Sequence, residues 1–193
     1  PAFRLTRFPA IGTMMTTLDQ QCRAALNRPA EQQALEYELQ WYTWGDLNKV
    51  AGAVEGLLAG AGVPQGQTVA FAPRNRPWMV AAELGMVAAG YTINMVYAFQ
   101  AAAGIARDVG KAGAMAVVAG EDDFSPELLA MVAEQGLAAI ALTPTGAHFV
   151  TGAERSTAKP SAIAPDGPHL LVHTSGTTGA PKSVGFSFDT IAK

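Results

Sequence analysis

The sequence is short of cysteine and of long apolar runs, and each shortage excludes a class of protein. Cys22 is the single cysteine, so an internal disulfide is excluded and a reducing cytoplasm is the expected location. The Cys22 side chain is expected in the core, on a helix. The apolar run from Met79 to Ala89 is interrupted by Glu83 and is too short to cross a bilayer, so no transmembrane segment is predicted. The first residues lack the continuous apolar core and cleavage site of a secretory signal.

Positive charge is also scarce and scattered. The chain has 13 lysines and arginines against 16 acidic residues, and Arg74 and Arg76 are the one close basic pair before Lys182. Nucleic-acid binding is therefore not expected. What is abundant is apolar: 49% of the 193 residues are hydrophobic and 15% are charged, which predicts a soluble globular protein with a sizeable core.

Helical and strand patterns alternate along most of the chain. Thr17 and Ser125 stand where N-caps are expected, and Thr43 with Asp46 resembles a capping box. Helices are expected within residues 17–28, 43–60, 75–90, 99–113 and 125–136, and strands within 34–44, 68–73, 91–96, 114–119, 137–142 and 169–174. This order predicts a layered α/β fold, with a mostly parallel sheet flanked by helices and right-handed crossovers. Residues 143–168 break the pattern, so they are expected to form a loose connection or a subdomain boundary.

A group of glycine and hydroxyl residues follows the last of these strands, in the stretch TSGTTGAPK from Thr174 to Lys182. Its two glycines permit tight turns and close backbone approach, and successive N–H groups in such a turn form a concave anion site. The hydroxyls add hydrogen-bond donors for phosphate oxygens or ligands for magnesium, and the lysine adds a positive charge. The stretch therefore has the chemistry of a phosphate-binding loop. The alternative is an ordinary flexible hairpin turn.

The residues after this loop distinguish it from a Walker A motif. Ala180 and Pro181 stand where a Walker loop places lysine and a hydroxyl residue. Val184, Phe186 and Phe188 alternate with small residues, which predicts a second strand in place of the helix that follows a Walker loop. We expect backbone amides, hydroxyls and the lysine to hold the anion with little help from a helix dipole.

The stretch TSGTTGAPK resembles the phosphate-loop signature of the adenylate-forming superfamily, which includes acyl-CoA synthetases, the adenylation domains of nonribosomal peptide synthetases, and luciferases. The stretches YTWGDL, AGAGVPQGQTVAF, GMVAAG and KAGAMAVVA resemble, in order, landmarks of the N-terminal part of those enzymes. The resemblance covers most of residues 41–193. It implies the N-terminal portion of the acyl-CoA synthetase fold.

The resemblance implies a two-step reaction. A carboxylate attacks the α-phosphate of Mg-ATP to give an acyl adenylate and pyrophosphate, and a thiol, usually of coenzyme A, then displaces AMP. The implied cofactors are ATP, Mg²⁺ and coenzyme A, and the implied partners are a carboxylic acid and the CoA thiol, with a homodimer left open. Lys182 and Thr177 are the candidate catalytic residues, and Thr177 is the candidate near the metal. The implied phosphate-binding residues are Thr174, Ser175, Gly176, Thr177, Thr178, Gly179 and Lys182.

The sequence also departs from the family pattern. Ser183 stands where glycine is usual, Phe188 where a histidine is common, and Met95 where proline is frequent. His173 replaces a frequent aromatic residue and is expected to pack at the strand end. The family's adenine and ribose contacts, magnesium-binding glutamate, hinge and catalytic lysine come later than any residue here. Residues 1–193 are therefore expected to be the first part of the AMP-binding domain of a longer enzyme, inactive alone.

Two other functions stay open at this point: an adenylation domain that loads a carrier protein, and a nucleotide-binding module without catalysis. Arg74, Asn75 and Arg76 follow a strand end, the edge where open α/β sheets bind ligands, and one interpretation is that they bind CoA phosphates. The favoured interpretation is a solvated loop in which Asn75 caps the next helix. Residues 121–124 are expected to form a solvated acidic turn.

Overall fold

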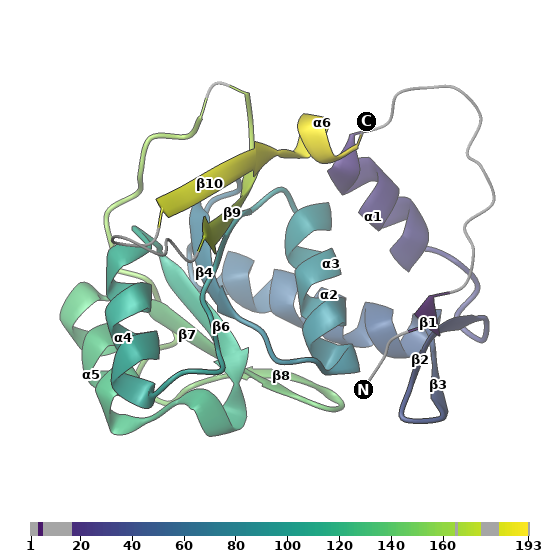
Figure 1. Ribbon diagram of the computed structural model, residues 1–193, viewed down its shortest axis with the longest axis horizontal. Helices are drawn as coiled ribbons and strands as arrows, with labels where there is room; N and C mark the ends of the chain where they lie inside the picture. Colours follow the sequence, from purple (N-terminus) through teal and green to yellow (C-terminus); the bar gives the residue numbers. More distant parts are fainter. Residues whose placement is uncertain (1–3, 6–16, 165, 175–181, 193) are drawn as a thin grey trace.

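The computed structural model describes residues 4–5, 17–164, 166–174 and 182–192. In this part of the chain a seven-stranded sheet runs in the order β10-β9-β5-β4-β6-β7-β8 (Figure 1). The strands β9, β5, β4, β6 and β7 are parallel to one another. The edge strands β10 and β8 are antiparallel to β9 and β7, respectively. The predicted mostly parallel sheet is thus confirmed. Its strands are β4 Thr68–Ala72, β5 Thr92–Met95, β6 Ala116–Gly120, β7 Ala138–Thr143, β8 Gly146–Phe149, β9 His169–Thr174 and β10 Lys182–Ser187.

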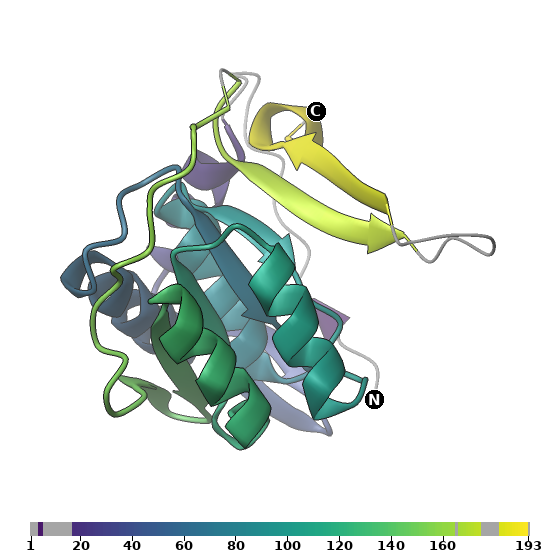
Figure 2. The ribbon, with the colours of Figure 1, turned by 90° about the vertical axis from the view of Figure 1, so that its left-hand side faces the viewer.

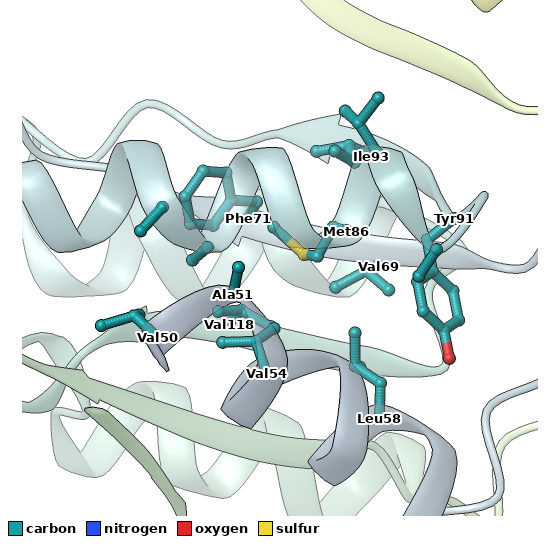
Figure 3. Packing of buried hydrophobic residues seen from close by; sticks show 14 of the residues in the cluster. Val50, Ala51, Val54, Leu58, Val69, Phe71, Met86, Tyr91, Ile93 and Val118 are labelled. Atoms are coloured by element: carbon teal, nitrogen blue, oxygen red, sulfur yellow. The ribbon is translucent and has the colours of Figure 1, made fainter. Parts of the chain in front are cut away.

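Helices cover both faces of this sheet. Because side chains alternate along a strand, Val69 and Phe71 of β4 pack with α1, α2 and α3, whereas Ala70 and Ala72 pack with α4 and α5. Figure 3 shows side chains of α2, including Val54, pointing toward Val69 and Phe71. The helices are α1 Leu18–Leu26, α2 Trp44–Gly60, α3 Pro77–Ala88, α4 Ala102–Lys111, α5 Pro126–Gln135, the 3₁₀ turn η1 Glu121–Asp123 and the short α6 Phe188–Ile191.

A second, smaller sheet contains β1 Arg4–Leu5, β2 Gln33–Tyr37 and β3 Gln40–Thr43, all antiparallel. Glu38 and Leu39 have φ of 50° and 65° in the turn between β2 and β3. At the end of β3, the Thr43 hydroxyl accepts from the Asp46 N–H and the Asp46 carboxylate accepts from the Thr43 N–H. This confirms the predicted capping box at the start of α2.

The close packing of α2 on α3 depends on a glycine. A Cβ added to Gly85 of α3 would lie 2.7 Å from the Ala51 carbonyl oxygen of α2. Cys22 of α1 is buried in the same layer, as predicted. None of the described helices is long and apolar enough to span a membrane.

The chain reverses its direction of winding at β4, which defines the candidate ligand-binding edge of the sheet. The crossover through α3 places β5 on one side of β4, and the crossover through α4 places β6 on the other. In open α/β sheets ligands bind outside the carboxyl ends of the strands, at such a switch point. Since β9 is parallel to β5, the loop that follows β9 leaves from this same edge.

The segment 143–168 contains a strand that the sequence pattern did not predict. Residues Gly146–Phe149 form β8, which pairs with β7. The following residues run along the surface and are held by hydrogen bonds, including a reciprocal pair between the Gln67 side chain and the backbone of Ser161 at 2.9 and 2.8 Å. A strand of four residues whose side chains stay partly exposed has too weak an alternation to be recognised in sequence.

Candidate functional site

Strands β9 and β10 form an antiparallel hairpin whose ends carry the candidate loop. Their register pairs His169 with Ser187 and continues to Thr174 and Lys182, which lie opposite each other at the loop end. This confirms the predicted strand after the loop. That strand ends earlier than expected: Phe188 is buried at the start of α6, where the Ser187 hydroxyl accepts from the Thr190 N–H. The strand–loop–strand context thus differs from a Walker loop.

The side chains expected to contact phosphate lie outside the described part of the chain, so their roles remain predictions. They are those of Thr174, Ser175, Gly176, Thr177, Thr178, Gly179 and Lys182. The predicted magnesium contact at Thr177 belongs to this set. Among the described residues, no group of three or more histidine, cysteine, aspartate or glutamate side chains could hold a metal ion.

An ion pair joins the ends of β4 and β6 at the carboxyl edge. Nε and Nη2 of Arg74 donate to Oδ1 of Asp123 at 3.0 and 2.5 Å, and the Asp123 side chain is 4% exposed. The hydrogen bond and charge of Asp123 raise the pKa of the Arg74 guanidinium. Gly120 leaves space for this carboxylate, because a Cβ there would lie 2.9 Å from its Oδ2. The expectation of a solvated turn at residues 121–124 is therefore wrong for Asp123.

The expected solvated loop holds for Asn75 and Arg76, which are exposed, but not for Arg74, which is partly buried. Arg76 Nη1 donates to the Tyr37 hydroxyl, and the guanidinium of Arg76 lies 5.8 Å from the Tyr37 ring centre. The N-cap of α3 is Arg76, not Asn75, and no side chain caps this helix. Pro77 sets this position, because its fixed φ favours the first helical residue.

Two exposed aromatic side chains lie beside the ion pair, and the sequence analysis did not single them out. Tyr97 and Phe99 follow β5, are 65% and 53% exposed, and have ring centres 5.9 Å apart. The Arg74 guanidinium lies 5.3 Å from the Phe99 ring centre. The available signal was their place directly after a strand that ends at the ligand-binding edge.

A buried amide contacts the residue that precedes the loop. Asn94 of β5 is 5% exposed, and its Oδ1 lies 2.9 Å from Nε2 of His173. His173 is exposed, so the expected packing at the strand end is wrong, and the imidazole instead contacts the buried amide through this hydrogen bond.

Comparison with known proteins gives the same picture of family and fold. The family model described as AMP-binding enzyme matches residues 22–193. No curated protein matches the chain. The ATP-bound MatB structure from Rhodopseudomonas palustris is 20% identical with a TM-score of 0.65, over 89% of this chain and 35% of that one.

Two further solved structures are similar. The anthranilate CoA ligase AuaEII in complex with anthranoyl-AMP is 17% identical with a TM-score of 0.62, over 90% of this chain and 35% of that one. The N-terminal domain of FACL13 from Mycobacterium tuberculosis is 22% identical with a TM-score of 0.60, over 89% of this chain and 44% of that one. The chain therefore spans about a third of the MatB and AuaEII structures.

Proposed function

The chain belongs to the AMP-binding enzyme family, and we propose that it forms the N-terminal part of an ATP-dependent acid–thiol ligase. The whole enzyme would activate a carboxylic acid as an acyl adenylate and transfer the acyl group to coenzyme A. The observation that carries this proposal is the β9–β10 hairpin, in which Thr174 and Lys182, the two residues that bound the candidate loop, lie opposite each other at the carboxyl end of β9. The family match and the fold shared with ATP-bound MatB support ATP as the nucleotide.

The composition of the hairpin fits a polyphosphate. Residues 167–188 contain Lys182 and two histidines but no carboxylate, so no negative charge on the hairpin would repel the anion. Two glycines in the loop allow backbone N–H groups to converge. In the proposed complex, the backbone from Thr174 to Gly179 and the Lys182 ammonium hold the β- and γ-phosphates.

The same phosphate contacts would also stabilise the transition state of the adenylation step. Negative charge accumulates on pyrophosphate as it leaves the α-phosphorus, and donors placed around it stabilise that charge. Mg²⁺, when bound, would neutralise part of the phosphate charge, and Thr177 is the residue of this chain that we propose beside it. Coenzyme A is proposed as the acceptor because the similar structures include a CoA ligase, AuaEII.

The Arg74 guanidinium is not proposed as a phosphate ligand. Its donors are directed at the Asp123 carboxylate, which is buried and would lose its partner if Arg74 turned to a ligand. Leaving this carboxylate unpaired costs about 2 to 3 kcal/mol, less than for a fully buried ion pair because the Arg74 side chain is 39% exposed. Arg74 is therefore better suited to holding the ends of β4 and β6 together, through Asp123, than to binding phosphate.

Titration of the 193-residue chain with Mg-ATP tests the proposed role of the loop. We expect Lys182→Ala to weaken ATP binding by about ten-fold, because a charge-assisted contact is worth roughly 1.5 to 3 kcal/mol. The matched control is Lys159→Ala, which removes an exposed lysine of the surface segment. Equal affinity in the two variants would remove Lys182 from the site. Acid-dependent exchange of pyrophosphate into ATP is expected only from a longer protein that includes this chain.

A further inference from the structure

The loop end of β9 is joined to the rest of the sheet by few contacts. The parallel register between β5 and β9 covers Ile93 with Leu170 and Asn94 with Leu171. The register ends at Leu171, and Figure 2 shows the β9–β10 hairpin projecting away from the helical layers. Within the described residues, one side-chain hydrogen bond joins the part of the hairpin beyond Leu171 to β5, between Nε2 of His173 and Oδ1 of Asn94. His173 is the residue directly before the loop.

Asn94 is a polar residue in an apolar, buried part of the sheet. It stands in register with Ala70 of β4 on the face that α4 covers, where the neighbouring buried residues are apolar. A buried amide is costly unless its groups are hydrogen-bonded. Its two partners are His173 on one side and, at 3.4 Å from Nδ2, the carbonyl oxygen of Ala112 at the end of α4.

These partners determine which ring nitrogen of His173 carries the proton. The Ala112 carbonyl can only accept, so the NH₂ group of Asn94 faces it and Oδ1 faces His173. Oδ1 in turn can only accept, so Nε2 of His173 carries a hydrogen. In the neutral ring Nδ1 is then the acceptor. Asn94 thus selects one tautomer and one ring orientation.

We propose that Asn94 is a positioning residue for the Thr174–Lys182 loop: it holds the His173 ring in the Nε2–H form and so fixes the end of β9 from which the loop begins. The hydrogen bond connects the residue before the loop to β5 and, through Ala112, to the end of α4, both of which belong to the packed layers. The link to ATP rests on the proposed function; the link between Asn94, His173 and the loop backbone does not.

Nuclear magnetic resonance of the 193-residue chain tests the positioning role without a ligand. At pH 8, ring nitrogen shifts are expected to show the Nε2–H tautomer of His173 in the wild type and a mixture of tautomers in Asn94→Ala. Backbone amide signals of residues 174–182 are expected to move in Asn94→Ala and in His173→Phe. Because His173 is exposed, the second variant removes no buried side chain, so it tests the hydrogen bond even if the first impairs folding.

Gln67→Ala is the matched control for these spectra. Gln67 is also a buried amide that bonds a surface segment, but its partner is Ser161 and it precedes β4 at the opposite edge of the sheet. Amide signals of 174–182 are expected to stay in place in this variant. An Nδ1–H tautomer in the wild type would overturn the proposal, as would signals of 174–182 that move equally, or not at all, in all three variants.

Titration with inorganic pyrophosphate and magnesium then tests whether Asn94 and His173 affect phosphate binding. We expect Asn94→Ala and His173→Phe to weaken binding by about three- to ten-fold, the worth of one hydrogen bond. His173→Gln should bind within about two-fold of the wild type, because the glutamine amide can still donate to Asn94. Unchanged affinity in Asn94→Ala would overturn the positioning role. If the wild type bound no pyrophosphate, the proposed function would fail, whereas the tautomer and amide shifts would still decide the role of Asn94.

Discussion

The parallel body of the sheet and the β9–β10 hairpin differ in how completely their side chains are buried. In the body, β4 buries Val69, Ala70 and Phe71 completely, so both of its faces are covered. In the hairpin, Val184 and Phe186 remain 38% and 40% exposed. Contacts of the body are therefore expected to determine stability, whereas the hairpin that carries the candidate loop is expected to open at a lower free energy. Stability and site geometry should then be separable by mutation.

The largest expected effect comes from one phenylalanine in each region. Phe71→Ala should lower the free energy of unfolding by about 3 to 5 kcal/mol, because it removes a fully buried ring and leaves a cavity. Phe186→Ala should cost less, about 1 to 2 kcal/mol, because Phe186 is already 40% exposed. Urea denaturation of both variants measures the difference. Similar losses would show that the hairpin is as strongly packed as the body.

A smaller effect is expected at the carboxyl edge, between these regions. Arg74→Met leaves the buried Asp123 carboxylate without its partner and should cost about 2 to 3 kcal/mol. The control is Arg107→Met, which removes an ion pair with Asp108 in which the arginine is largely exposed. That loss should stay below about 0.5 kcal/mol. Equal unfolding midpoints for the two variants in urea would contradict a structural role for the Arg74–Asp123 pair.

The sequence predicted those elements whose signals are local. The capping box of Thr43 and Asp46, the Ser125 cap and the strand from Thr68 each follow from residues within one turn or one strand, and all are observed. The α/β fold with a mostly parallel sheet followed from their alternation. Where local patterns were strong, the fold could thus be predicted without tertiary information.

Pairings between distant residues could not be predicted in this way. Arg74 and Asp123 are 49 positions apart, and Asn94 and His173 are 79 apart. Their contact depends on which strand ends lie side by side, and this follows from the order of strands in the sheet and not from the spacing of residues. Sequence therefore located the edge at which the candidate site lies, but not the side chains that come together there.

The smallest expected effect concerns Glu83, at the junction of the body and the hairpin. A cavity of about 220 Å³ beside this residue is lined by apolar side chains from α1, α3, β9 and α6. Burial raises the pKa of the Glu83 carboxyl above its usual value. The other titratable group in the lining is Cys22, whose pKa is raised to about 11, first by burial and then by Glu83 and Asp19. Between pH 4 and 8 the thiol therefore stays protonated, so a pH dependence arising in this cavity would come from the Glu83 carboxyl.

The sign of the pH dependence follows from this raised pKa. In the unfolded chain the Glu83 carboxyl loses its proton at the usual pKa, whereas in the fold it retains the proton to higher pH. The unfolded chain then binds fewer protons, so the contribution of Glu83 to stability, complete at low pH, declines as pH rises through the folded pKa. Glu83→Gln removes this decline, and its advantage in urea denaturation should grow from pH 4 to pH 8. Glu134→Gln, on the exposed side of α5, should follow the wild type. A constant difference between Glu83→Gln and the wild type across this range would mean that the Glu83 carboxylate is as well solvated in the fold as in the unfolded chain, and that the junction between body and hairpin is open to water.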